Sequence, residues 1–533
     1  MYRLPYAAPL PRMVYGRTHV VLAVFLAALA WLGCLAWMRP LALPDEGRYV
    51  GVSLEMLHSD NWITPTLDGL PFLHKPPLFY WITAGAMHLF GLNEWAARAA
   101  PVLGGATTVA VLFAALREWA GESAARMAAL VLATLPLFYG GSQFANMDQL
   151  VAACISAAIL FGARASFRFE AGTERSDDLA SAYVAAALGV LAKGLIGLVL
   201  PGLVLLLWLG TMRHWRTMRA LVWWPGTAML AVIVVPWLVA VQWENPGFLY
   251  YYFVVQQFQR YAGSGFNNVQ AVWFYIPVLA VFGLPWTGWL LANLRRSVVT
   301  RACPPAVRYL MWLWLGVVVL FFSIPQSKPM GYALPALAPL AALIALTAAP
   351  LVKDSHRARI VWQLCAGTAA VVCVVVTIGF AVARPKTSLD LAMALAASRD
   401  PHDGLAFIDE YRYDVSFYLR DAAPVFVVSN WDPVEVRQND NWRRELADAA
   451  SFAPVVDATR LLGSAQFRKA LCSGRIKWVM AKLDSATRYP MLNTAQLVAT
   501  DRDSALWRTD VANPIFATAA NCAAAPAYIN DVR

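Results

Sequence analysis

Charged side chains gather in one short stretch of this otherwise apolar chain, directly after its first long hydrophobic segment. Only 14% of the 533 residues are charged, yet the interval 43–81 contains Asp45, Glu46, Arg48 and Lys75. Charges beside a membrane segment are costly unless water solvates them or the protein uses them. A carboxylate there can serve as a general base, and a lysine or arginine can stabilise a phosphate. We interpret this stretch as one half of an active site, with simple solvation at a membrane boundary as the plain alternative.

Two further ionisable residues interrupt apolar stretches: Asp148 in the motif N-M-D-Q and Lys193 in A-K-G. Cationic side chains placed together with two carboxylates are typical of a site for an anionic lipid head group. A polyprenyl-phosphate sugar suits such a site, because its leaving group is already a phosphate and needs no general acid. Lys75 and Lys193 would hold that phosphate, while Asp45 would remove a proton from the acceptor.

The elements that must position these residues are membrane helices. The chain is 59% hydrophobic, its mean hydropathy is +0.51, and its apolar runs of roughly 18–22 residues match a bilayer core. The first run, 20–38, reads as a retained anchor rather than a cleaved signal. The net charge of +10 comes mostly from arginines in short gaps between spans, which indicates membrane orientation and no nucleic-acid partner. The candidate spans are 19–38, 98–116, 125–141, 148–163, 179–192, 195–211, 221–242, 270–293, 308–323, 331–349 and 360–383.

The run 77–92 is ambiguous, and the distribution of basic gaps decides it. If Arg12 and Arg17 start inside, every later basic gap is inside only when 77–92 does not cross the membrane. We therefore expect an interfacial or re-entrant helix there. The loop 39–97 and the motifs around Asp148, Lys193 and Lys328 then face the outside of the plasma membrane.

After residue 384 the composition becomes that of a soluble domain. Short β-like runs at 405–409, 424–429, 478–482 and 497–501 alternate with helical patterns, which predicts an α/β domain of about 150 residues that caps the membrane domain. We expect a membrane domain over 1–383, with its first outer loop at 39–97, and an outer α/β domain over 384–533. Cys472 and Cys522 are the two cysteines of this domain, and the sequence leaves their pairing open.

The order of motifs resembles one family of membrane enzymes. The sequence L-P-D-E-G-R-Y after the first span, then H-K-P-P-L-F-Y-W, N-M-D-Q, A-K-G and S-K-P-M-G-Y-A-L-P, is similar to the aminoarabinose transferases, in the superfamily of the protein O-mannosyltransferases. The resemblance implies a C-type glycosyltransferase fold, a polytopic α-helical protein with about 11–13 transmembrane helices and interfacial helices in the first outer loop. It also implies transfer of 4-amino-4-deoxy-L-arabinose from undecaprenyl phosphate to lipid A phosphates, at the periplasmic face of the bacterial inner membrane.

The resemblance also implies roles for individual residues. Asp45 and Asp148 match the two catalytic acids of the family. The donor phosphate would be bound by Lys75, Lys193, Arg48 and Arg260. The substrate pocket would contain Glu46, Tyr49, His74, Tyr80, Lys328 and Tyr332, and Tyr332 has an alternative as an interfacial aromatic residue.

Two departures from the family pattern concern a metal ion. The family has Glu before Lys-Pro-Pro, where this chain has His74, and its E-H-I-Q-R-F segment is here Gln256 to Tyr261. The family associates that Glu and the His of that segment with a bound metal, and the His position is Gln257 in this chain. Glutamine is a weak ligand, so we assign no cofactor and keep His74 as the one candidate ligand for a divalent metal.

Other functions remain open on the sequence. The same reaction with another sugar or acceptor, such as mannose to a protein or a sugar to a surface glycan, fits the same motifs. A lipid or solute transporter would also bind its substrate at broken helices, but it predicts charges near the midplane and two related halves. We expect the protein to bind a polyprenyl-phosphate sugar, lipid A or another periplasmic acceptor, and membrane lipids, and to be a monomer.

Overall fold

The computed structural model describes residues 18–259, 268–294, 303–384, 386–438, 440–454 and 459–522. The chain divides into two compact units: residues 1–40 with 74–384, the membrane unit, and residues 41–73 with 385–533, the C-terminal unit. We had placed residues 41–73 in the membrane domain because they follow its first helix. In the structure they pack with the C-terminal unit, since their helix and hairpin bury side chains against its loops.

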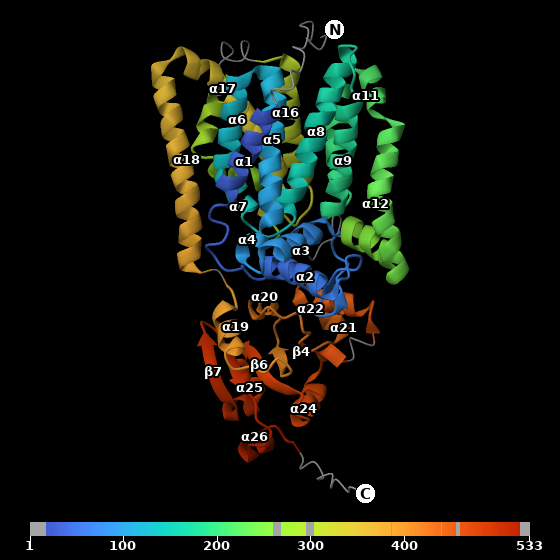
Figure 1. Ribbon diagram of the computed structural model, residues 1–533, viewed down its shortest axis with the longest axis vertical. Helices are drawn as coiled ribbons and strands as arrows, with labels where there is room; N and C mark the ends of the chain where they lie inside the picture. Colours follow the sequence, from blue (N-terminus) through green and yellow to red (C-terminus); the bar gives the residue numbers. More distant parts are fainter. Residues whose placement is uncertain are drawn as a thin grey trace. The chain divides into compact units, whose positions relative to one another are not determined.

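Helices account for nearly all of the membrane unit (Figure 1). They are α1 (Thr18–Gly33), α3 (Leu78–Phe90), α4 (Glu94–Ala97), α5 (Ala99–Ala120), α6 (Glu122–Thr134), α7 (Pro136–Ser142), α8 (Asp148–Glu170), α9 (Ser176–Lys193), α10 (Ile196–Thr211), α11 (Trp215–Leu221), α12 (Trp224–Glu244), the π-helix η2 (Tyr250–Gln259), α14 (Tyr275–Phe282), the 3₁₀ helix η3 (Trp286–Leu294), α16 (Pro305–Ser323), the 3₁₀ turn η4 (Met330–Ala333), α17 (Leu334–Asp354) and α18 (His356–Ala383).

Helices α5, α8 and α17 form the centre of this unit, and α12 and α18 lie at its periphery. In the most apolar window of α8, 89% of residues are buried, whereas the corresponding share for α18 is 17%. Peripheral helices that expose apolar side chains along their length are typical of surfaces in contact with lipid. Six helices of the described residues are long and apolar enough to cross a membrane, or seven if the bent pair α6–α7 is one span. The protein is therefore a multi-pass membrane protein, and the number of about 11–13 spans stays a prediction.

Two predicted segments look different in detail. The run 77–92 forms α3, which has only 13 residues and runs across the long helices of its unit in Figure 1. A helix of that length covers about 20 Å, less than the roughly 30 Å of a bilayer core, in agreement with the prediction that it does not cross. The predicted continuous span 270–293 is wrong as a single helix, because it is broken into α14 and η3. Pro285 lies at the break and has no N–H to continue the helical hydrogen bonds.

The C-terminal unit contains a six-stranded sheet with helices around it, as predicted from its alternating pattern. Its elements are α2 (Asp45–Ser59), β1 (Thr66–Leu67), β2 (Leu70–Pro71), α19 (Leu389–Ala396), β3 (Gly404–Ile408), α20 (Val415–Leu419), β4 (Phe426–Val428), α21 (Pro433–Gln438), α22 (Trp442–Ala450), β5 (Leu461–Leu462), α24 (Ser464–Cys472), β6 (Ile476–Lys482), α25 (Ser485–Arg488), the 3₁₀ turn η5 (Pro490–Thr494), β7 (Gln496–Asp501), β8 (Ser504–Arg508) and α26 (Pro514–Ala519).

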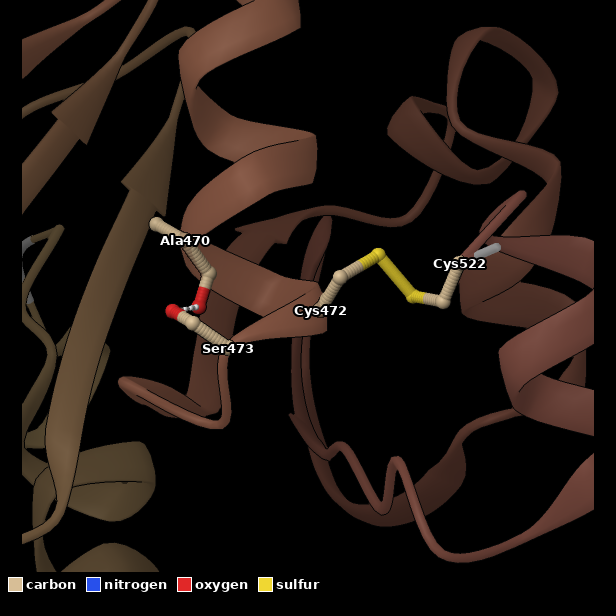
Figure 2. The surroundings of a disulfide bond; sticks show 4 residues. All are labelled: Ala470, Cys472, Ser473 and Cys522. Carbon is tan, nitrogen blue, oxygen red and sulfur yellow. Dashed lines mark hydrogen bonds between the residues drawn. A yellow bond between two sulfur atoms is a disulfide. The ribbon is translucent and has the colours of Figure 1, made fainter. Parts of the chain in front are cut away.

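The strand order is β5-β4-β3-β6-β8-β7. The first four strands are parallel, and β8 and β7 extend the sheet as an antiparallel pair. The disulfide between Cys472 and Cys522 joins the end of α24 to the segment after α26, with 5.3 Å between the two Cα atoms (Figure 2). The pairing that the sequence left open is therefore present.

Candidate active site

The membrane unit contains a cavity of about 360 Å³ that combines charged and apolar walls. Its charged walls are Lys75, Asp148 and Lys193, which the sequence analysis had placed in one site. Most of the remaining wall is apolar and includes Val151, Ile155, Leu195, Ile196, Val199, Phe321, Phe322 and Pro335. A cavity of this composition suits a ligand with an anionic head and a hydrocarbon tail.

Asp148 and Lys193 meet because they end two neighbouring helices. Asp148 is the first residue of α8 and Lys193 the last residue of α9, and these helices pack side by side. A carboxylate at a helix N-terminus and an ammonium at a C-terminus are each stabilised by the helix dipole. Gly194 ends α9 with a φ of +108°, a conformation that residues with a side chain rarely adopt. The ammonium of Lys193 forms an ion pair with Oδ1 of Asp148, and both side chains are largely buried.

Tyr332 completes this pair from η4. The ammonium nitrogen of Lys193 lies 4.2 Å from the centroid of the Tyr332 ring, within the range of a cation–π contact. The neighbouring Gly331 lies so close to Asp148 that an added Cβ would be 2.3 Å from its Oδ2. Any side chain at position 331 would therefore displace the carboxylate, and glycine leaves room for it.

The lysine of H-K-P-P reaches the same cavity from the loop before α3. Lys75 is half-buried and lines the cavity together with Gln256 of η2. His74 is buried and its ring centroid lies 5.7 Å from that of Tyr251, whose hydroxyl accepts a hydrogen bond of 2.8 Å from Nε2 of Gln256. Tyr80 of α3 is fully buried, and neither His74 nor Tyr80 is among the cavity-lining residues.

Lys328 has a different environment from the one expected for a pocket residue. Its buried ammonium donates to three backbone carbonyls, including that of Gln270 at 2.9 Å and that of Pro325. These bonds join the segment before α14 to the loop after α16. We interpret Lys328 as a residue that fixes this loop, on which the nearby Tyr332 depends.

The acidic residues that follow α1 lie in the C-terminal unit. Asp45 and Glu46 occupy the first turn of α2, where acidic residues favour the helix dipole. Glu46 is buried and accepts the N–H of Ala42 at 2.9 Å. One guanidinium nitrogen of Arg48 contacts Oδ1 of Asp45, and the Arg48 carbon Cζ lies 4.9 Å from the ring centroid of Tyr49.

The structure thus groups Lys75, Asp148, Lys193 and Tyr332 around one cavity, and Asp45, Arg48 and Tyr49 in a second cluster. Arg260 lies outside the described residues. Gln256 lines the cavity although the sequence singled it out only as a departure from a metal motif.

The residues that could hold a metal do not fit one. The described part of the chain contains no group of three or more His, Cys, Asp or Glu side chains placed to hold a metal ion. His74 lies against an aromatic ring, and the side chain of Gln257 lies outside the described residues. No step is therefore derived through a metal.

Known glycosyltransferases are similar to this chain in sequence. The family described as dolichyl-phosphate-mannose-protein mannosyltransferase matches residues 74–239. The chain is 32% identical over 330 residues to the undecaprenyl phosphate-alpha-4-amino-4-deoxy-L-arabinose arabinosyl transferase of Enterobacter sp. (strain 638). It is 31% identical over 346 residues to the enzyme of the same description from Aeromonas hydrophila. These matches cover 60% and 63% of this chain, and they span 58% and 62% of the relatives' own length.

A solved structure extends the similarity to almost the whole chain. The crystal structure of ArnT from Cupriavidus metallidurans bound to undecaprenyl phosphate superimposes with a TM-score of 0.77 at 25% identity, covering 92% of this chain and 98% of that one. Over most of its length this chain is therefore similar to the aminoarabinose transferases, and residues 74–239 match the protein mannosyltransferase family. The apo oligosaccharyltransferase of Archaeoglobus fulgidus, with a TM-score of 0.51 at 13% identity, shares the fold alone over 90% of this chain and 71% of that one. The predicted C-type glycosyltransferase fold with a C-terminal α/β region is confirmed.

Proposed function

We propose that this protein is a glycosyltransferase that moves a sugar from undecaprenyl phosphate to an acceptor. The proposed sugar is 4-amino-4-deoxy-L-arabinose and the proposed acceptor is a lipid A phosphate. The observation that carries the proposal is the cavity in which Lys75, Lys193 and Asp148 meet an otherwise mostly apolar wall. The relatives that match the chain are described by the same donor and sugar.

The donor phosphate is the leaving group of this reaction. When the bond between the anomeric carbon and the phosphate oxygen breaks, negative charge grows on the phosphate and the lysine ammonium groups stabilise it. An ammonium has three N–H donors, so Lys193 can contact Asp148 and a phosphate oxygen together. The half-buried Lys75 would contribute the second positive charge.

Asp45 is the proposed base and carboxylate partner of the sugar. It is 47% exposed, so its second oxygen is accessible to an acceptor. It would accept a proton from the acceptor and would also stabilise positive charge at the anomeric carbon as the leaving group departs. Asp148 is 13% exposed and ion-paired, which suits a role in orienting Lys193 rather than in proton transfer.

The proposed location is the bacterial inner membrane, with the cavity and the C-terminal unit on the periplasmic side. Basic residues such as Arg117, Arg126, Arg164 and Arg168 lie at the helix ends opposite to Asp148 and Lys193, which is the arrangement expected of cytoplasmic loops. Transfer at that face requires a donor that is already activated, because the periplasm does not supply nucleotide sugars. The protein is proposed to act as a monomer.

Mass spectrometry of lipid A tests the sugar and the acceptor. Lipid A from cells with and without the gene is expected to differ by the mass of one amino-pentose on a phosphate, and a chromosomal Asp45→Asn variant should resemble the deletion. Identical lipid A spectra under conditions in which the protein is present would contradict the assignment.

A second candidate keeps the reaction and changes the sugar or the acceptor. It is favoured by His74 and Gln257. These residues replace the Glu and the His that the aminoarabinose transferases associate with a metal ion. In that case lipid A would be unchanged, and purified protein would still release undecaprenyl phosphate from another polyprenyl-phosphate sugar.

A further inference from the structure

Helix α2, which carries the proposed base Asp45, packs at the carboxyl end of the parallel strands, where such sheets usually bind ligands. Strand β3 lies between β4 and β6, and the strand order changes direction at β3. Open α/β sheets usually bind ligands at such a topological switch point, beyond the carboxyl ends of the strands. Here the turn that follows β3 contacts α2 instead. An added Cβ on Gly47 would lie 2.9 Å from the backbone nitrogen of Asp414. The carboxyl end of the parallel strands therefore binds α2 through the turn after β3.

Arg48 links the C-terminal unit's helix α22 to the proposed base Asp45. Its Nη2 contacts Oδ1 of Asp45, and its Nη1 contacts Oε1 of Glu445 on α22. Arg48 and Glu445 are largely buried, at 15% and 13% exposure. The guanidinium is a rigid, planar fork, so fixing one of its nitrogens fixes the direction of the other.

Tyr413, in the turn after β3, in turn fixes Glu445. Its hydroxyl donates to Oε2 of Glu445 at 2.7 Å, and its ring centroid lies 5.9 Å from Cζ of Arg48. Burial raises the pKa of Tyr413 well above its usual value, and the charge of Glu445 raises it further, so the phenol remains a donor. Both oxygens of Glu445 therefore have a partner, and the buried carboxylate is held in one orientation.

We propose that Glu445 is a positioning residue for sugar transfer. It orients Asp45 through Arg48, and it pairs with part of the positive charge of Arg48, which would otherwise pair with Asp45 alone. This inference rests on the proposed function, and on Asp45 acting as its base. Two carboxylates compete for one guanidinium, so the strength of one contact limits the strength of the other. Removing the charge of Glu445 would therefore strengthen the contact between Arg48 and Asp45.

Glu445→Gln tests the charge-sharing step. The amide keeps the size of the side chain and an acceptor for Tyr413, but Arg48 is then neutralised by Asp45 alone. The acidic limb of the pH profile of kcat is expected to move to lower pH, and kcat at neutral pH to fall by up to about tenfold. The KM for the donor should stay within about twofold, because the phosphate-binding lysines are not altered.

Tyr413→Phe provides a second variant with the opposite expectation. Loss of the hydroxyl leaves the charge of Glu445 less neutralised, so Glu445 competes more strongly for Arg48 and the acidic limb should move to higher pH. Glu435→Gln is the matched control, because Glu435 is an exposed carboxylate of the same unit that pairs with Arg443. Its profile should coincide with that of the unmodified protein.

The measurement uses purified full-length protein in nanodiscs with undecaprenyl-phosphate-linked aminoarabinose and lipid A. The acceptor titrates identically in every variant, so a difference between profiles belongs to the protein. Absence of transfer by the unmodified protein would defeat the proposed function itself. An active protein whose Glu445→Gln and Tyr413→Phe variants keep the original kcat and acidic limb would overturn the role of Glu445. A loss of kcat in both variants with no shift of the limb would also overturn it, since that pattern indicates a purely structural contact.

Discussion

The ion pair between Lys193 and Asp148 allows a direct test of the donor site. In Lys193→Met the apolar stem is kept and the ammonium is lost. Asp148 is only 13% exposed, and removing one partner of a buried ion pair typically costs about 3–5 kcal/mol. Because Asp148 retains some exposure and accepts a weak bond of 3.4 Å from Asn146, we expect the lower end, about 3 kcal/mol.

The same substitution should weaken donor binding for a separate reason. A hydrogen bond to a charged group contributes about 1.5–3 kcal/mol, so undecaprenyl phosphate should bind about 10- to 150-fold more weakly. These two effects can be separated by Lys193→Met combined with Asp148→Asn. The double variant contains no unpaired charge, so it should recover most of the stability. It should not recover affinity for the phosphate.

Thermal unfolding of the detergent-solubilised protein measures the first effect, and titration with undecaprenyl phosphate measures the second. Lys353→Met, at an exposed lysine near the end of α17, serves as a control and should change neither quantity. If the double variant binds undecaprenyl phosphate as tightly as the unmodified protein, Lys193 serves only to neutralise Asp148. The assignment of the lysine to the donor phosphate would then be refuted.

Three further outcomes are expected. Asp45→Asn should lower the rate of sugar transfer about 10²- to 10⁴-fold, as loss of a general base does. Binding of undecaprenyl phosphate, measured in the same titration, should stay unchanged. Retained transfer would show that this carboxylate is not the base. Replacing Cys472 and Cys522 by serine should destabilise the C-terminal unit by about 2–4 kcal/mol in denaturant unfolding, because the disulfide closes a long loop with a separation of 50 residues. Burial raises the pKa of Asp68 well above its usual value, so the folded form binds the proton more tightly than the unfolded form and stability falls as pH rises above the unfolded pKa. Asp68→Asn should therefore unfold at a higher temperature than the unmodified protein at pH 7 and at the same temperature near pH 3, and equal melting temperatures at both would contradict this reasoning.

The charged residues of the membrane-unit cavity stand out in the sequence because charge in an apolar sequence is informative. Asp148 and Lys193 each stand out against their helices, and helix ends are the places where such charges are least costly. The sequence therefore singled out both residues, and the structure places them at neighbouring helix ends on one cavity. It could not identify their contact with each other, because which helix ends are neighbours depends on packing among many similar Ala- and Leu-rich faces.

The remainder was hidden for equally physical reasons. Glu445 lies on a polar helix of a soluble domain, where a glutamate is ordinary, and its partner Arg48 is 397 positions away. The resemblance implied a substrate-pocket role for Lys328, but in the structure its ammonium donates to backbone carbonyls, which no local sequence pattern predicts. The break at Pro285 was missed because hydropathy averages over a window and does not register a missing N–H.

The two clusters share one construction, and this suggests how their roles divide. In each, a cation holds a carboxylate and lies over a tyrosine ring: Arg48 with Asp45 and Tyr49, and Lys193 with Asp148 and Tyr332. The pairs differ in exposure, since Asp45 is 47% exposed and Asp148 13%. A base must reach its acceptor and exchange a proton with it, whereas a carboxylate that orients a phosphate-binding lysine gains from burial, because a drier environment strengthens the pair. Under the proposed function, proton transfer would therefore fall to Asp45, and Asp148 would control the leaving phosphate through Lys193.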